Sequence, residues 1–398
     1  MLSLRTIKNV QFQDIDEFLK KYKVPGRSSK ITGNTSEEKF KNYIDLIHEE
    51  ISKENGSITA NNVDDFLFER LFYANNNYHY LYKYDNFFAD ESTPASTAID
   101  YLSDSESLLF NHLLTNDIVY KEGEFSLCTT RLEHVEEEVV AVHLVILIDM
   151  LPLRYGNTHV FAGITIDIKR KLVDIKFDYK QFEEIETEPL KLIKQIRDML
   201  CGLGKMGKTY TDLHLNIISF NDAEPREIIY YLFEELTNEA EALLNNHVPP
   251  DTEDKIKKFM KEMGLSDDNP EYVEQIKVVI YQDIFESLGE ASYKNGWVFR
   301  FHFREGDHTR ATSTNEKQLP VYKAKTYWQL KELIHEEQEM YEAGFHWYMT
   351  EGTENREFVI VRMESKNDTM ILHHYYKMRS GRKEKDEFVL RKIGKYLS

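Results

Sequence analysis

A short segment near the middle of the chain has the residue types and the spacing that hold a nucleoside phosphate. Positions 202–209 read GLGKMGKT. In such a loop, Gly202 and Gly207 allow backbone N–H groups to surround a phosphate. Lys208 would reach the outer phosphates, and Thr209 would hold Mg²⁺. These residues are a candidate cofactor site for a nucleotide.

The segment resembles the P-loop of nucleotide triphosphatases, but its neighbours in the sequence differ from those of a P-loop. A P-loop follows a strand and opens a helix, so that the helix N-terminus faces the phosphate. Here Leu190, Ile193, Ile196 and Leu200 recur at helical spacing and predict a helix before the loop, while 213–220 is predicted as a strand after it. The alternative is a helix C-terminus whose glycines end the helix and whose lysines complement its dipole.

A second candidate site lies in the last third of the chain. Positions 358–366 read FVIVRMESK, so that an apolar strand ends in Glu364-Ser365-Lys366. Glu364 could hold Mg²⁺ while Lys366 stabilises charge on a phosphate. The pattern resembles the third element of the restriction-endonuclease-like fold, which implies a Mg²⁺-dependent nuclease. The metal-binding aspartate of the preceding strand is missing, and the alternative is a polar hairpin turn over 364–368.

A third candidate site is the segment RFHFREGDHTR at 300–310. Arg300, His302 and Arg304 alternate along a predicted strand, so they share one face and could seat an anion or phosphate. We favour the alternative, an exposed sheet face beside a turn.

The C-terminal segment opposes the overall charge of the chain. Residues 377–398 contain eight lysines and arginines against three acids, with tyrosines beside them. Arg382 and Lys383 are the candidate contacts to nucleic acid. The alternative is that the segment docks on the acidic remainder of its own chain.

A predicted hairpin over 164–177 gives a further cluster of charges. If Ile168 pairs with Val173, two aspartates face each other across the strands, which a cation or diagonal lysines would have to compensate. We predict a solvated face with ion pairs rather than a metal site. The polar residues of this face are Asp167, Lys169, Asp174 and Lys176.

Composition and charge bound the class of protein. The 398 residues carry 69 acids against 50 lysines and arginines, a net charge of −19, which repels nucleic acid and favours a basic protein partner. Two cysteines, Cys128 and Cys201, are too few for a disulfide framework and indicate a reducing compartment. No secretory signal or membrane span is recognised, so we expect a cytoplasmic protein with no membrane contact. The abundance of Lys, Glu, Asn, Ile and Tyr suggests an AT-rich bacterial source.

The predicted elements indicate an α+β fold with mixed or antiparallel sheets. Thr35 and Glu38 have capping-box spacing at the start of a helix, and further helices are predicted near 105–114 and over 224–244, 252–263 and 271–288. Strands are predicted over 78–88, 120–180 and the last hundred residues, with a strand or short helix at 388–390. We expect an N-terminal α+β domain (1–185), a helical segment (186–290) and a C-terminal α+β domain (291–398).

These patterns favour a protein that acts through macromolecular contact, as a regulator, adaptor or assembly subunit, because no catalytic pattern agrees with its surroundings. The cofactor stays unknown, with Mg²⁺ expected only for the nuclease. The nuclease is the first alternative, and nucleotide binding at 202–209 is the second.

Overall fold

The structure of the chain is a computed structural model that describes residues 2–153, 156–203, 212–265, 270–305, 309–314, 317–350, 356–375 and 381–397. It divides into two compact units. Unit 1 comprises Met1–Ser219 and Lys377–Arg382, and unit 2 comprises Phe220–Tyr376 and Lys383–Ser398. The sequence placed soft boundaries near 185 and 290, whereas the units divide the chain after Ser219.

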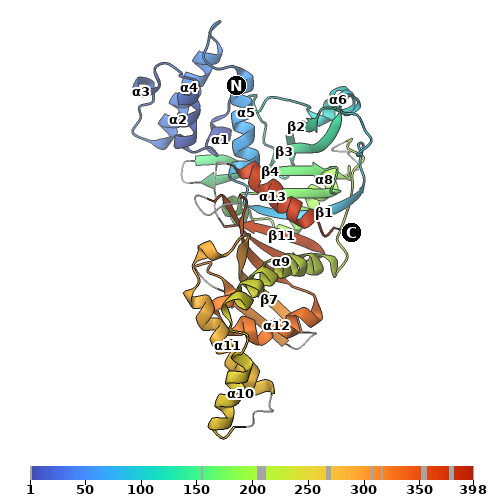
Figure 1. Ribbon diagram of the computed structural model, residues 1–398. Helices are drawn as coiled ribbons and strands as arrows, with labels where there is room; N and C mark the ends of the chain where they lie inside the picture. Colours follow the sequence, from blue (N-terminus) through green and yellow to red (C-terminus); the bar gives the residue numbers. More distant parts are fainter. Residues whose placement is uncertain are drawn as a thin grey trace. The chain divides into compact units, whose positions relative to one another are not determined.

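Unit 1 is built on antiparallel strands in the order β2-β3-β4-β5-β1, with β6 pairing on the end of β1 (Figure 1). The strands β3 and β4 bury side chains on both faces, which explains the long apolar run in β3. The bounds are β1 Tyr78–Asn86, β2 Ser126–Val135, β3 Glu138–Leu153, β4 Gly156–Asp167, β5 Leu172–Phe177 and β6 Asn216–Ile218.

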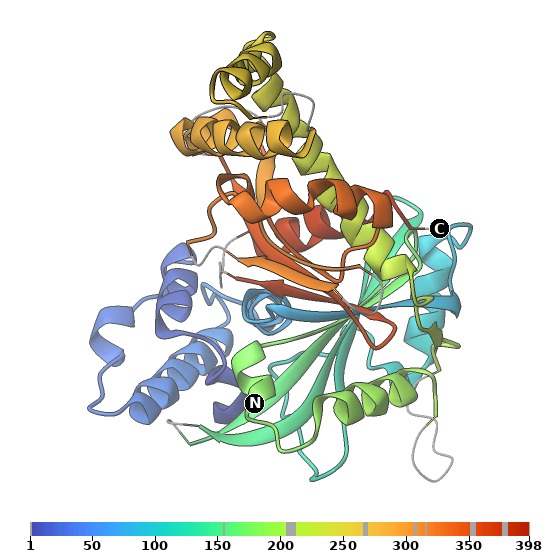
Figure 2. The ribbon, with the colours of Figure 1, turned by 90° about the horizontal axis from the view of Figure 1, so that it is seen from below.

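The N-terminal helices of unit 1 pack on this sheet (Figure 2). Their apolar side chains share one core with Cys128 of β2, Val145 of β3 and Phe161 of β4. The capping box predicted at Thr35 and Glu38 is confirmed, and it begins α4. The N-terminal helices are α1 Leu4–Ile7, α2 Phe12–Lys21, α3 Arg27–Lys30, α4 Ser36–Ile51, α5 Ala60–Phe68 and the π-helical η1 Glu69–Ala74. The later helices of unit 1 are α6 Ala95–Asp104, α7 Tyr179–Glu183 and α8 Pro189–Leu200.

Unit 2 has antiparallel strands in the order β11-β10-β9-β7-β8. Helices α9 and α13 cover the same face, because Phe233 lies against Phe301 and Phe388 lies against Trp347, with ring centroids 6.0 and 6.3 Å apart. The elements are α9 Glu224–His247, α10 Thr252–Glu262, α11 Pro270–Ser287, β7 Gly296–Glu305, β8 Thr309–Thr314, α12 Lys325–Glu337, β9 Glu342–Tyr348, β10 Phe358–Lys366, β11 Thr369–His374 and α13 Arg382–Gly394.

Helices and strands are grouped along the chain instead of alternating strictly, so the predicted α+β class is confirmed. Of the helix predicted near 105–114, only a single 3₁₀ turn is found, η2 Glu106–Leu108. Helix α6 ends before this range, and the left-handed backbone of Leu109 and Asn111 stops η2 from continuing as an α-helix. Of the two alternatives for 388–390, the helix is found. In the described part of the chain, every helix is too short or too polar to cross a bilayer.

Candidate functional site

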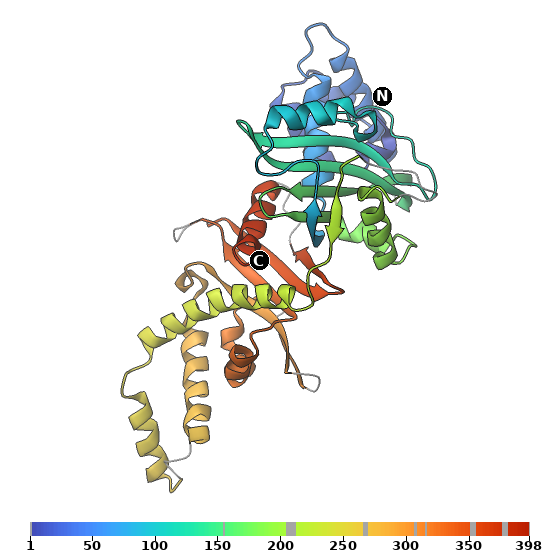
Figure 3. The same ribbon diagram turned by 90° about the vertical axis from the view of Figure 1, so that its right-hand side faces the viewer.

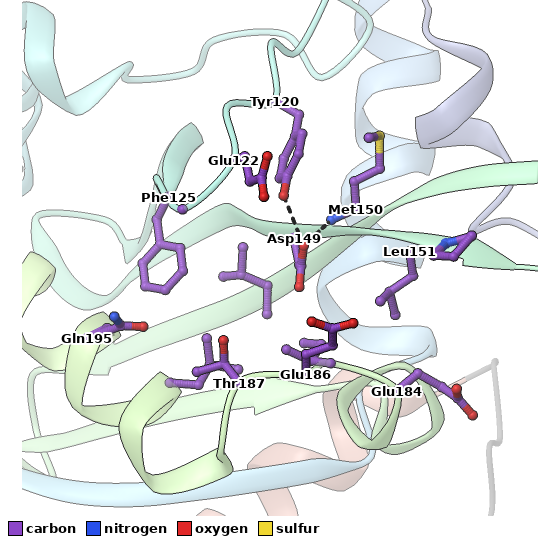
Figure 4. A pocket seen from close by; sticks show the side chains of 15 residues that line it. Tyr120, Glu122, Phe125, Asp149, Met150, Leu151, Glu184, Glu186, Thr187 and Gln195 are labelled. Atoms are coloured by element: carbon purple, nitrogen blue, oxygen red, sulfur yellow. Dashed lines mark hydrogen bonds between the residues drawn. The ribbon is translucent and has the colours of Figure 1, made fainter.

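Unit 1 contains a pocket of about 620 Å³ beside the end of β3 (Figure 4). Three segments line it: residues 120–125 before β2, residues 148–152 of β3, and residues 184–195 from the end of α7 into α8. This volume falls in the range of sites that enclose a small ligand or a few side chains, about 300–1,000 Å³. The segments are far apart in sequence, so only the folded sheet brings them together.

The floor of the pocket is apolar. Ile148, Leu151, Ile185 and Leu192 line it, and each is less than a tenth exposed. The ring of Phe125 is half-buried at its side (Figure 4). Such a floor can pack against the aliphatic part of a ligand.

A bulge in β3 places the central polar group of the pocket. The pairing of β3 with β4 shifts between Leu147 and Asp149, so that Ile148 is an extra residue in the strand. Bulges of this kind redirect the side chains that follow them. Asp149 is the residue that follows, and its half-buried carboxylate lies in the pocket (Figure 4).

Two neutral donors fix the orientation of the Asp149 carboxylate. Its Oδ1 accepts hydrogen bonds from the hydroxyl of Tyr120 (3.1 Å) and from the backbone N–H of Met150 (2.7 Å). Burial and the hydrogen bond to Asp149 raise the pKa of the Tyr120 hydroxyl, which therefore stays protonated as a donor. These two donors hold the carboxylate in place, and neither of them carries a positive charge.

Three further carboxylates surround the opening. Glu122, Glu184 and Glu186 are exposed and line the same pocket, and no lysine, arginine or histidine is among the described residues that line it. The N-terminus of α8 contributes a partial positive charge of only about half a unit, which is small beside four carboxylates. The pocket therefore attracts a positive charge.

The carboxylates are not arranged as a metal site. In the described part of the chain, no three of them bring oxygens within 4.8 Å of one another. The described lining residues include no serine, cysteine or histidine, and the groups that can take part in chemistry are the four carboxylates, Thr187 and Tyr120.

The P-loop-like segment follows a helix, as the sequence predicted. Helix α8 ends at Leu200, and Gly202 has a left-handed φ of 71°, the conformation of a glycine that ends a helix. Gly207, Lys208 and Thr209 lie outside the described residues. The order of helix and then loop differs from that of a P-loop.

The nuclease-like pair lies where β10 turns into β11. Lys366 pairs with Thr369, and the two residues between them have left-handed backbone angles, so the predicted alternative of a hairpin turn is confirmed. Glu364 of β10 lies opposite Glu342 of β9. Each carboxylate has an arginine partner: Arg362 lies 3.6 Å from Glu364, and Arg300 forms an ion pair with Glu342. These ion pairs occupy the carboxylates that Mg²⁺ would need.

Arg300, His302 and Arg304 do share one face of β7 and are half-buried. Arg300 is paired with Glu342, and the guanidinium of Arg304 lies 4.7 Å from the ring centroid of Tyr341. These contacts already occupy both arginines in part. Anion binding at this face stays a prediction.

The basic C-terminal segment contacts its own chain. Arg382 is buried, 3 % exposed, and donates to the carbonyl oxygen of Asn76 at 3.0 Å, so its assignment as a nucleic-acid contact is wrong. Lys392 and Lys395 bind the carboxylate of Glu235 on α9 at 2.7 and 3.1 Å. Lys383 remains on the surface. The alternative, docking on the chain's own acids, describes this segment.

The hairpin of β4 and β5 is present, but its register and burial differ from those predicted. Val173 pairs with Ile166, and Asp174 faces Thr165, so the two aspartates are not opposite each other. Asp174 and Lys176 are 1 % exposed, because η1 covers this face. The prediction of a solvated face is therefore wrong for both residues.

Sequence reasoning missed the pocket. One signal was present: Asp149 interrupts the most apolar run of the chain, in a strand whose neighbours are buried. Comparison with known proteins adds no relative, since no family model, curated protein or solved structure matches the chain. The function therefore rests on the chemistry of the site.

Proposed function

We propose that this protein is a recognition module that binds a basic segment of a partner protein, with a lysine or arginine side chain in the pocket of unit 1. One observation carries the proposal. Four carboxylates line a half-open pocket with an apolar floor, and no cation among the described lining residues neutralises them. Buried carboxylates are normally paired with a cation, whereas the half-buried Asp149 is hydrogen-bonded by two neutral donors, so a cation that binds here would complete its surroundings.

The two parts of the pocket match the two parts of a basic side chain. The aliphatic stem of lysine or arginine can pack on Ile148, Leu151 and Leu192. Its charged head can then reach Asp149, whose Oδ1 is oriented by Tyr120, and the rim carboxylate of Glu186. Charge-assisted hydrogen bonds of this kind are about twice as strong as neutral ones.

The charge of the whole chain supports the same partner. A net charge of −19 raises the rate of encounter with a basic protein and disfavours an acidic one. A bacterial cytoplasmic setting is part of the proposal. Both cysteines are free thiols, and burial raises the pKa of Cys128 to about 12, so that thiol is unreactive.

The test compares the binding of synthetic peptides by calorimetry, using the full chain. Peptides that carry lysine or arginine between apolar residues should bind, and the same peptides with glutamine should not. Asp149→Asn should weaken binding about tenfold or more, because a hydrogen bond to a charged group contributes about 1.5–3 kcal/mol. Glu54→Gln, an exposed acid that does not line the pocket, is the control with the same change of charge.

Three outcomes separate the possible sources of the cation. Binding by peptides but not by free lysine or a polyamine supports recognition of a protein segment. Equal binding by a free polyamine would assign the pocket to a small-molecule cation instead. If Asp149→Asn and Glu54→Gln had the same effect, the pocket would not be the binding site.

A further inference from the structure

A hollow of about 550 Å³ lies among the N-terminal helices α2, α3 and α4 of unit 1 (Figure 1, Figure 3). Residues from all three helices line it. The helices are joined by contacts of residues that do not line the hollow. Phe12 of α2 packs against Phe40 of α4, with ring centroids 4.4 Å apart, and Lys30 of α3 forms an ion pair with Glu49 of α4. The fold thus brings side chains from three separate segments around one space.

Charges of both signs line this hollow. Asp16 and Glu17 of α2 contribute two carboxylates, while Lys20 of α2 and Arg27 of α3 contribute two cations. Asp16 and Lys20 have the i, i+4 spacing at which ion pairs form on a helix. Within the described part of the chain, however, neither Lys20 nor Arg27 forms an ion pair. The opposite charges therefore face the same space without neutralising each other by direct contact.

Neutral donors hold the two carboxylates in place. The side-chain amide of Gln13 donates to Glu17 at 3.0 Å. Burial and a hydrogen bond to Asp16 raise the pKa of Tyr43, so its hydroxyl stays protonated and donates to that carboxylate. The charge of Arg27 acts on the pKa of the same hydroxyl in the opposite direction, so Asp16 and Arg27 both lie near it.

A smaller hollow of about 430 Å³ adjoins the first on the side of the cations. It shares Lys20 and Arg27 with the first hollow and adds Lys23, and its described lining contains no carboxylate. Leu19 and Val24, both less than a tenth exposed, form its apolar part. Lys20 and Lys23 lie at the C-terminal end of α2, where lysines complement the helix dipole. That role does not explain Arg27, which begins the next helix.

The sequence of charges along the two hollows defines a class of ligand. Two carboxylates line only the first hollow, two cations line both, and a third cation lines only the smaller one. The complementary ligand has one ammonium group followed by two acidic groups. A free acidic amino acid has this set of groups. A residue inside a peptide does not, because its amino and carboxyl groups are bound in amide bonds.

We propose that the hollows between α2, α3 and α4 bind a free acidic amino acid of the glutamate or aspartate class. Its ammonium group lies at Asp16 and Glu17, and its two carboxylates lie at Arg27 and the two lysines. The planar guanidinium of Arg27 suits a carboxylate, with which it can form two parallel hydrogen bonds. The proposal does not depend on the pocket around Asp149.

The first test measures the binding of L-glutamate and L-aspartate to the full chain by calorimetry, beside two matched analogues. L-glutamine keeps the shape of glutamate but lacks the second acidic group, and glutarate lacks the ammonium group. Each analogue should bind about tenfold more weakly or less, because it loses hydrogen bonds between charged groups. Wild-type chain that binds neither amino acid, or that binds either analogue or inorganic phosphate as tightly as glutamate, would overturn the proposal.

Two variants test the orientation of the ligand. Arg27→Gln should weaken the binding of glutamate and of glutarate, since both carry the carboxylates. Glu17→Gln should weaken glutamate but leave glutarate equally tight or tighter, because glutarate has no ammonium group to lose a partner. Lys39→Gln, which removes an exposed lysine of α4 that lines neither hollow, is the control.

The split between the two ligands separates a contact from a loss of structure. Circular dichroism confirms that each variant is folded. An equal loss of glutamate and glutarate binding in Glu17→Gln would contradict the assigned position of the ammonium group, and so would unchanged glutamate binding.

Discussion

Two aspartates of unit 1 lie in the same sheet but in opposite electrostatic surroundings. Asp174 on β5 is buried, and its Oδ2 lies 3.1 Å from Nδ1 of His79 and 3.5 Å from Nζ of Lys176. Asp149 on β3 is half-buried, and its hydrogen bonds come from neutral donors, Tyr120 and the backbone of Met150. The fold places a lysine and a histidine beside the first aspartate, whereas other carboxylates line the same pocket as the second.

The difference separates charge that stabilises the fold from charge that can bind a partner. Burial by itself would raise the pKa of Asp174, but the charges of His79 and Lys176 outweigh it, so this pKa is lowered. Lys176 is held in turn above the ring of Phe72, 4.4 Å from its centroid. The charge of Asp174 is thus compensated within the fold, whereas the hydrogen bonds to Asp149 come from neutral donors, and its charge can still interact with a cation.

The largest effect is expected from Asp174→Asn, which removes the negative charge from the buried cluster. It leaves Lys176 buried without its carboxylate partner and should lower the free energy of unfolding by about 3–5 kcal/mol. Chemical denaturation checks this value against Glu54→Gln, for which we expect a change within about 0.5 kcal/mol. A loss below about 1 kcal/mol would mean that the buried pair adds little, as many exposed pairs do.

A buried histidine extends the comparison to a group that the fold keeps neutral. His159 is 1 % exposed, and burial, with a smaller contribution from the charge of Arg5, lowers its pKa to about 4. The unfolded chain then binds a proton between pH 6.5 and 4 that the folded chain does not bind, so stability falls as the pH falls through this window. We expect a loss of about 2 kcal/mol between pH 7 and 5 from this group.

The measurement is denaturant unfolding at both pH values, for the wild-type chain and for His159→Gln. The variant should be less stable at pH 7, because the ring is buried, but it should lose less stability on acidification. An identical pH dependence in the two chains would show that His159 is not the group responsible. Asp174 does not interfere in this window, since the stability that a lowered carboxylate pKa provides is lost only at a pH below the ordinary pKa of an aspartate.

The sequence predicted the features that depend on neighbours in the chain. The capping box at Thr35, the helix before Gly202 and the hairpin of β4 and β5 all follow from local spacing, and all are present. It failed for Lys176, which looks like a solvated residue on an alternating strand. That residue is buried because Phe72, about a hundred residues away, packs over it.

The pocket lies beyond local reasoning for the same physical reason. Its carboxylates come from three segments, and only the pairing of β3 with its neighbours brings Glu122 and Glu186 to the two sides of Asp149. Periodicity reports which side of a strand a residue occupies, but it does not report what packs there. The aspartate inside an apolar run was the only local signal, and it did not identify its companions.

Tyr120→Phe sharpens the comparison by removing one donor from Asp149. The loss of one hydrogen bond should lower the free energy of unfolding by about 1 kcal/mol. It should also weaken the binding of a basic peptide, because the carboxylate is no longer held in one orientation. Calorimetry of the variant and of the wild-type chain checks both effects. Unchanged peptide affinity would mean that the orientation of Asp149 does not matter for binding.

Glu186→Lys is expected to have the smallest effect on stability. It would make the surroundings of Asp149 resemble those of Asp174, because a lysine of the same chain would then lie near each carboxylate. The new lysine would provide the rim of the pocket with an internal cation, as Lys176 does for Asp174. Since Glu186 is exposed, the gain from an ion pair there should be about 0–1 kcal/mol. The affinity for a basic peptide should nevertheless fall at least as far as in Asp149→Asn, because the chain then occupies its own site. A variant that bound the peptide as well as the wild-type chain would show that uncompensated charge is not what the pocket offers to a partner.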